Sequence, residues 1–255
     1  MNESVLIVDK VPGPTSFDVV RAMQPIFGGR KVGHAGSLDP FASGVLVILV
    51  GRATKLSNAL LNADKSYRAT VKLGDATDTL DRTGKVIESK PIPELTRAQV
   101  EAAVNSFQGT WNQTPPMYSA KKIQGVRLYT LARKSIEVRR LPIPVELYRM
   151  ELLTFEPPYL TFEVECSKGT YIRSLAEDLG KRLGTVAHLA ELRRLSCGPF
   201  KLEEAVTLEK IVQAPENELR AGYQNFVRLL RAEGLIRKPV KSPESQRTSF
   251  ANAPG

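Results

Sequence analysis

The sequence predicts an α+β fold with a mixed, mostly antiparallel central sheet flanked by helices and loops. Three observations lead to this prediction. Apolar stretches with the period of strands occur along the whole chain, but they do not alternate strictly with helical segments. Two strand candidates, residues 145–155 and 160–167, are separated only by Glu156-Pro157-Pro158, as in an antiparallel hairpin. Hydrophobic residues make up 42% of the chain and charged residues 25%, which is typical of a folded globular protein.

The first elements are a strand over residues 4–8 and a helix after the turn of residues 10–14. Thr15 or Ser16 can cap this helix, and Pro25 with Gly28-Gly29 ends it. Its inward-facing residues are expected to be Val19, Val20 and Met23. A glycine-rich stretch, residues 33–40, then leads into the apolar run 45–50. We therefore expect a loop that directly precedes a buried strand.

Residues 53–61 have helical spacing, and residues 66–73 alternate polar and apolar residues like a half-buried strand. An acidic turn follows, with Asp75, Asp78 and Asp81. It lacks the alternating ligands, central glycine and closing glutamate of a calcium loop, so we predict a solvated loop there.

Thr96 and Gln99 form a capping box before a helix that presents Val100, Val104 and Phe107 on one face. The prolines exclude a helix over residues 113–119, and another helix is predicted over 126–134. Near the C-terminus, Thr170 can cap a helix that carries Ile172, Leu175, Ala176 and Leu179 and that Gly180 or Gly184 ends. Further expected elements are a strand near residues 195–200 and helices near 208–212 and 216–233.

The charge of the chain favours a polyanionic partner. Lys and Arg number 36 against 27 acidic residues, which gives a formal charge of +9. The only two cysteines, Cys166 and Cys197, are expected to be reduced thiols. The start of the chain lacks the pattern of a signal peptide, and no segment reaches the length of a membrane span. We therefore expect a cytoplasmic protein without a membrane partner, and a monomer.

One stretch, residues 31–46, places the carboxylate of Asp39 between a flexible glycine loop and a rigid strand. A rigid element beside the side chain can hold a catalytic residue in a fixed position. Taken alone, however, an aspartate before a proline is more often an ordinary turn former than a catalytic residue, and this reading of Asp39 is favoured from the local pattern. His34 has the same ambiguity, because it fits a general acid or base, a stacking platform for a nucleobase, or a turn residue.

A second stretch, residues 166–175, leaves a strand through Gly169 and enters a helix near Thr170. A helix start presents backbone N–H groups and the positive end of the dipole, and Lys168 and Arg173 add charge. We therefore expect an anion to bind near the start of this helix. The alternative is that Arg173 is an ordinary solvated residue of the helix and binds no anion.

Together these stretches resemble the TruB-type transfer RNA pseudouridine synthases over residues 5 to about 205. The resemblance rests on five segments in the order of the family: Val8-Asp9-Lys10 with Gly13-Pro-Thr-Ser16, Gly33-His-Ala-Gly-Ser-Leu-Asp-Pro40, Lys65-Ser-Tyr-Arg68, Pro115-Pro-Met-Tyr-Ser-Ala-Lys121, and Cys166 to Leu175. It implies the pseudouridine synthase fold and isomerisation of a uridine in the T-loop of tRNA, at position 55, without a metal or other cofactor.

The resemblance also implies roles for individual residues. Asp39 would be the catalytic carboxylate, acting by attack on the base or by proton abstraction from the sugar. Tyr67 would stack under the uracil and move a proton, and Arg173 would pair with Asp39 and keep it ionised. His34 would help to hold the extruded nucleotide. Lys10 would support the active-site loop.

Leu192 matches an apolar residue that lies against the base, although a core position explains it equally well. The residues expected to contact RNA are His34, Lys65, Arg68, Lys121 and Lys168. We expect residues 1–237 to form one catalytic domain, with a short helical extension from about residue 204 and no evident PUA domain, and residues 238–255 to form a flexible polar tail.

Three other functions remain open at this stage. The chain could bind tRNA and help it to refold without catalysis, although Asp39, Tyr67 and Arg173 together argue against this. It could be a synthase directed by a guide RNA, but those enzymes depend on partner proteins and a PUA domain. It could be a basic RNA-binding module without enzymatic activity.

Overall fold

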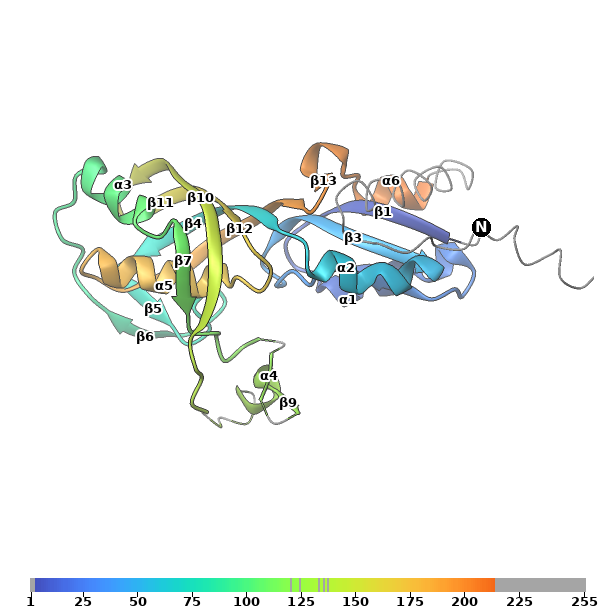
Figure 1. Cartoon of the computed structure of the whole chain (residues 1–255), viewed down its shortest axis with the longest axis horizontal. Coiled ribbons are helices and arrows are strands. Elements are labelled where there is room, and N and C mark those ends of the chain that lie inside the picture. Colours follow the sequence, from blue (N-terminus) through green and yellow to red (C-terminus); the bar gives the residue numbers. More distant parts are fainter. Residues whose placement is uncertain are drawn as a thin grey trace, which may run out of the picture.

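The computed structural model of the protein describes residues 3–119, 121–123, 125–132, 134, 136 and 138–213. One sheet of nine strands runs along the length of an elongated molecule (Figure 1). Its main strands follow the order β1-β3-β12-β4-β11-β10-β7, with β2 paired to β3 and β13 paired to β12. Every pair in this sheet is antiparallel except β3 with β12, so the predicted α+β class is confirmed.

The strands of this sheet are β1 (Glu3–Lys10), β2 (Val32–His34), β3 (Ser43–Gly51), β4 (Lys65–Leu73), β7 (Gly109–Gln113), β10 (Ile143–Glu156), β11 (Tyr159–Cys166), β12 (Ala187–Cys197) and β13 (Phe200–Lys201). Two small hairpins lie outside it: β5 (Asp75–Thr77) with β6 (Val86–Ser89), and β8 (Lys122–Ile123) with β9 (Val126–Arg127). The hairpin β8–β9 and the short helix α4 (Leu128–Ala132) project from the body of the molecule (Figure 1).

The N-terminal half is built on β3, which is buried along nearly its whole length because helical turns cover one face and α1 covers the other. The helix α1 (Ser16–Met23) begins after Thr15, whose side chain forms the predicted cap together with Asp18. The helix predicted over 53–61 is divided. It starts as a 3-10 helix, Arg52–Leu56, and continues as the α-helix α2 (Ser57–Leu61).

The second half packs α3 (Arg97–Asn105) against β10 and α5 (Ile172–Arg182) against β4 and β12. The capping box of Thr96 and Gln99 starts α3 (Arg97–Asn105), as predicted, and Phe107 lies buried just beyond its end. The predicted hairpin is formed by β10 and β11. The helix α5 (Ile172–Arg182) buries its apolar face against β12, as its spacing of leucines predicts.

Three local predictions were wrong. Thr170 does not cap α5; its hydroxyl donates to Ser167 O at 2.9 Å, and Tyr171 at the cap position makes no side-chain cap. The strand expected near 195–200 is mostly the end of the longer strand β12, which turns at Gly198 into β13. The helix expected over 126–134 starts as the strand β9 and is helical only in α4.

The two halves of the sheet meet where β12 runs beside β3. We call this contact the β3–β12 junction; it consists of two residue pairs, Arg193 with Ser43 and Arg194 with Gly44. Gly44 has φ +100°, and a Cβ built on it would lie 2.2 Å from the carbonyl oxygen of Arg194. Only glycine lets the two backbones approach this closely.

We therefore expect Gly44→Ala to destabilise the protein by about 3 kcal/mol, because backbone strain and overpacking at the junction add. Equilibrium urea unfolding measures this. Gly28→Ala is the control, since Gly28 also has a positive φ, of 59°, but open space around its Cβ position. Equal losses for the two variants would show that the close approach at Gly44 carries no cost of its own.

Two predictions lie outside the described residues: the helix near 216–233 and the polar tail of residues 238–255. The predicted short helix near 208–212 is present as α6 (Leu208–Gln213). In the described part of the chain, no helix combines the length and apolar character needed to cross a bilayer.

Candidate active site

A pocket of about 650 Å³ opens beside the β3–β12 junction. The glycine-rich loop before β3 forms one wall, with Asp39 at its end, and the start of α5 forms the opposite wall, with Arg173. Tyr67 and Leu192 line it from the adjacent strands β4 and β12. The structure thus brings residues from both halves of the chain, far apart in the sequence, to one cavity.

Asp39 and Arg173 form a two-point ion pair. Arg173 Nε lies 3.0 Å from Asp39 Oδ2, and Nη2 donates to Oδ1 at 3.3 Å. The arginine side chain is 6% exposed, whereas that of Asp39 is 38% exposed and faces the pocket. Burial raises the pKa of the Asp39 carboxyl above its ordinary value, and the Arg173 charge opposes that rise. The carboxylate is held in place yet remains accessible to a ligand.

A second carboxylate completes this arrangement. Asp81 Oδ2 lies 3.6 Å from Arg173 Nη1, and its side chain is 5% exposed. The prediction of a solvated acidic loop was therefore wrong for Asp81, which also accepts hydrogen bonds from Thr79 and Thr83. Arg173 lies in the first turn of α5, where the positive end of the helix dipole disfavours a cation. The carboxylates of Asp39 and Asp81 offset this unfavourable interaction. Nothing in the spacing of the three aspartates distinguishes Asp81.

The remaining donors of Arg173 bind backbone. Nη1 donates to Thr79 O at 3.1 Å, and Nη2 donates to Tyr118 O at 2.8 Å. Tyr118 comes from the segment of the Pro115-Pro116 motif, so the arginine ties three parts of the chain together. The guanidinium is fixed from several directions before any ligand binds, which is the condition for a preorganised site.

The loop that carries Asp39 is held from behind by two polar side chains. Lys10 Nζ donates to three carbonyls, Val11 O, Pro40 O and Ala42 O, at 3.0, 3.1 and 2.7 Å. The Oγ of Ser16 accepts from Leu38 N at 2.8 Å. Burial lowers the pKa of Lys10 to about 8. These contacts place Lys10 where a support of the loop is expected.

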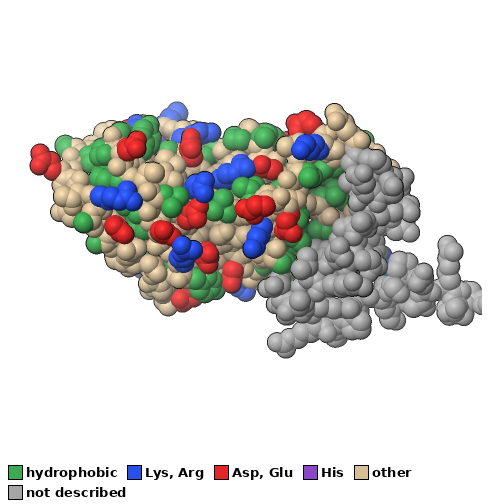
Figure 2. Space-filling view, turned by 90° about the horizontal axis from the view of Figure 1, so that it is seen from above, with side chains coloured by type: hydrophobic (Ala, Val, Ile, Leu, Met, Phe, Trp, Pro, Cys, Tyr) green, Lys and Arg blue, Asp and Glu red, His purple; other side chains and the backbone are tan. Residues whose placement is uncertain are grey.

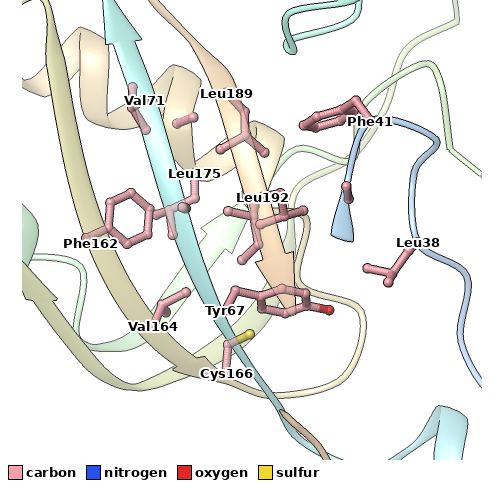
Figure 3. Packing of buried hydrophobic residues seen from close by; sticks show 14 of the residues in the cluster. Leu38, Phe41, Tyr67, Val71, Phe162, Val164, Cys166, Leu175, Leu189 and Leu192 are labelled. Carbon is pink, nitrogen blue, oxygen red and sulfur yellow. The ribbon is translucent and has the colours of Figure 1, made fainter. Parts of the chain in front are cut away.

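Tyr67 supplies the aromatic surface of the pocket. Figure 3 shows its ring beside Leu192, with the hydroxyl directed toward the loop that carries Leu38. Burial raises the pKa of its phenol to about 12, so the phenol is protonated at neutral pH. Leu192 is 8% exposed and belongs to the main core as well as to the pocket wall, so its position is compatible with either reading.

His34 lies at the end of β2 and lines the same pocket. Burial lowers the pKa of its imidazole, and the charge of Arg194 adds to this, so the ring is neutral at pH 7. Its Nδ1 atom is buried and has no hydrogen-bond partner within the described ranges. A buried ring nitrogen without a partner is suited to bind a ligand that reaches it.

The other residues expected to contact RNA differ in their placement. Lys65 Nζ donates to the backbone carbonyls of Leu60, Leu61 and Ala63, which leaves no free hydrogen for a phosphate. Arg68 lies on the strand face opposite Tyr67 and forms an ion pair with Glu163 at 2.7 Å. This geometry favours structural roles for both side chains.

Lys168 and Lys121 lie closer to the pocket. Lys168 is exposed between the pocket residues Ser167 and Gly169, and its ammonium donates to Asn62 Oδ1 at 3.1 Å. Lys121 is half-buried and follows the pocket residues Tyr118 and Ser119 in the chain. On the face seen in Figure 2, by contrast, acidic and basic side chains are intermixed, so no basic patch gathers there.

The described residues include no group of three or more histidine, cysteine, aspartate or glutamate side chains that could hold a metal ion. Among the groups that line the pocket are the Asp39 carboxylate, the neutral imidazole of His34, the phenol of Tyr67 and apolar surface. This set suits a nucleotide, whose base can stack on an aromatic ring while the carboxylate meets the reacting atoms.

Comparison with known proteins agrees with this site. Residues 24–172 match the model of the TruB family pseudouridylate synthase N-terminal domain, and residues 173–230 match that of the tRNA pseudouridylate synthase B C-terminal domain. The chain is 48% identical to tRNA pseudouridine synthase B of Syntrophotalea carbinolica, over 84% of this chain and 70% of that protein. It is 45% identical to the protein of the same name from Opitutus terrae, over 85% and 90% of the two chains.

Solved structures show the same fold. The chain is 33% identical to a chain in the crystal structure of a Cbf5-Nop10-Gar1 complex, with a TM-score of 0.66. The match covers 82% of this chain and 54% of that one, so this chain spans about half of the length of that structural relative. The family models cover most of the residues, and the curated relatives are matched over more than two thirds of their length. The chain therefore belongs to the TruB family of pseudouridylate synthases.

Proposed function

We propose that this chain isomerises the uridine at position 55 in the T-loop of tRNA to pseudouridine, with Asp39 as the catalytic carboxylate. The observation that carries the proposal is the ion pair of Asp39 and Arg173 in a pocket that Tyr67 also lines. The family supplies the reaction. The N1–C1′ bond of uridine is broken, a C5–C1′ bond forms, C5 loses a proton, and N1 gains one, so the overall composition is unchanged.

The geometry supports distinct roles for the three residues. Breaking the glycosidic bond creates electron deficiency at the sugar, and a carboxylate fixed by Arg173 can stabilise it or act as a nucleophile. Tyr67 offers its ring to the extruded base and its protonated phenol for a proton transfer. His34 and Leu192 line the pocket wall and complete the contact with the nucleotide.

The partner follows from the same reasoning. The target base is stacked inside the T-loop, so extrusion must be offset by stacking and phosphate contacts. Lys168 and Lys121, at the pocket rim and on the segment beside it, are our candidates for phosphate contacts. We place the protein in the cytoplasm, where tRNA is processed, and we propose that it acts as a monomer with residues 1–237 as one catalytic domain.

Chemical labelling of pseudouridine followed by primer extension tests the proposal. The purified protein is incubated with an unmodified tRNA transcript and with a transcript that carries cytidine at position 55. A single stop in the T-loop of the first transcript, absent from the second, is the expected result. Tight binding of tRNA without any stop would contradict the proposal.

We also expect the reaction to slow as the pH falls, because Asp39 acts as a carboxylate. Burial raises its pKa, so protonation begins at a higher pH than for an ordinary aspartate. The single-turnover rate, measured between about pH 4 and pH 8, reports this loss. Binding of tRNA, measured over the same range, separates protonation of the site from loss of affinity. A rate that stays constant down to about pH 4, the ordinary range of aspartate, would contradict the expectation.

A further inference from the structure

Arg194 is a buried cation that none of the roles above uses. Its side chain lies at the β3–β12 junction, where Arg194 is the register partner of Gly44 on β3 and of Tyr67 on β4. The residue is 1% exposed, and it lines the pocket. Within the described ranges, no carboxylate lies within ion-pair distance of its guanidinium.

The guanidinium binds backbone carbonyls instead. Nε donates to Val45 O at 2.6 Å, Nη2 to Gly36 O at 3.2 Å, and Nη1 to Ser37 O at 3.5 Å. Gly36 and Ser37 precede Asp39 in the loop, whereas Lys10 binds the carbonyls of Pro40 and Ala42 after it. Two buried cations thus hold the loop on either side of the catalytic carboxylate.

Stability alone does not account for an arginine here. A buried charge without an ionic partner is costly, and an apolar side chain of similar length would often be neutral or stabilising. The cation also acts on the residues of the pocket. It opposes the rise that burial causes in the pKa of Tyr67, and it adds to the lowering that burial causes in the pKa of His34.

We propose that Arg194 is a positioning residue of the reaction, which holds the loop carrying Asp39 in register with Tyr67. The inference rests on the proposed function. Arg194 reaches Asp39 only through the loop carbonyls, so its effect on the carboxylate is one of placement. The guanidinium spreads its donors over three nitrogen atoms in a fixed plane and so reaches Val45 O, Ser37 O and Gly36 O from separate atoms, whereas a lysine ammonium presents all its donors from one atom.

The test compares Arg194→Met and Arg194→Lys with the wild-type chain on unmodified tRNA. We measure the single-turnover rate, the Kd for tRNA and the melting temperature. The control is Arg193→Met, because Arg193 lies next in the chain but on the opposite face of β12, where it pairs with Asp9 at 2.7 Å. The control is expected to keep the wild-type rate within about threefold, because its half-buried ion pair lies outside the pocket lining and surface ion pairs contribute little.

We expect Arg194→Met to lower the rate about 100-fold, the scale of a misplacement of about 1 Å, while the Kd changes less than about threefold. Arg194→Lys keeps the charge, so we expect its rate to be about tenfold higher than that of Arg194→Met and about tenfold lower than that of the wild type. If Arg194→Met does not fold, a folded Arg194→Lys that is about tenfold slower than wild type supports the proposal.

Three results would overturn it: a folded Arg194→Met or Arg194→Lys with the wild-type rate, a rate loss matched by an equal rise in Kd, or an equal rate loss in Arg193→Met. A wild-type chain that forms no pseudouridine would overturn this proposal and the proposed function together. An active wild type with an equally active Arg194→Met would overturn this proposal alone.

Discussion

Replacing Asp39 by asparagine is expected to lower the rate of pseudouridine formation by a factor on the order of 10⁴, the scale seen when a catalytic group is removed from a preorganised site. The amide keeps the size of the side chain but loses the charge that assists glycosidic bond cleavage. The fold should survive, because Arg173 keeps Asp81 and the carbonyls of Thr79 and Tyr118 as partners. Single-turnover kinetics with quantitative pseudouridine mapping measures the loss.

Asp178→Asn is the matched control, since Asp178 is half-buried on α5 and pairs only with Lys181 among the residues described. It should retain the wild-type rate. Binding of tRNA by Asp39→Asn should stay within about threefold of wild type, because the lost carboxylate repels phosphate rather than attracts it. A folded Asp39→Asn with more than about a tenth of the wild-type rate would contradict the assignment of this residue.

Replacing Arg173 by methionine is expected to affect both activity and stability. Asp39 loses the cation that orients it and opposes its protonation, and Asp81, whose side chain is 5% exposed, loses its ionic partner. Removing one member of a buried ion pair costs about 3–5 kcal/mol. We expect a loss of this size in urea unfolding and a rate lowered by a factor on the order of 10³.

The second substitution Asp81→Asn, added to Arg173→Met, separates the two effects. It removes one buried charge and should restore part of the stability, but the rate should stay low because Asp39 remains unpaired. Arg182→Met is the control on the same helix, where Arg182 stacks on Phe107 at 4.4 Å and is exposed. Full recovery of the rate in the double variant would show that Arg173 acts only on stability.

The sequence predicted most of the regular elements because their signals are local. The helix cap at Thr15 or Ser16, the capping box at Thr96, the alternation in β4 and the apolar run in β3 each depend on neighbouring residues. The predictions that were wrong depend on tertiary contacts. β12 extends far beyond residues 195–200 because it pairs with both β3 and β4, and no local pattern shows those partners.

The pocket residues divide in the same way. The resemblance pointed to Asp39, Tyr67 and Arg173, and the structure brings all three to one cavity. Asp81 and Arg194 were missed, because an aspartate in a polar turn and an arginine in a strand are usually solvated. Only the fold buries them beside the pocket, where their charges act on Arg173 and on the loop before Asp39.

The β3–β12 junction has a consequence for the biosynthesis of the protein. β12 is the strand that connects the two parts of the sheet, and it occupies residues 187–197, well after the other main strands in the sequence. A ribosome makes the N-terminal segment with Asp39 long before it makes β12, and contacts of such sequence separation form slowly. The nascent chain therefore holds the Asp39 loop before Tyr67 and Arg173 can surround it, and the pocket can be complete only when Cys197 has left the ribosomal tunnel.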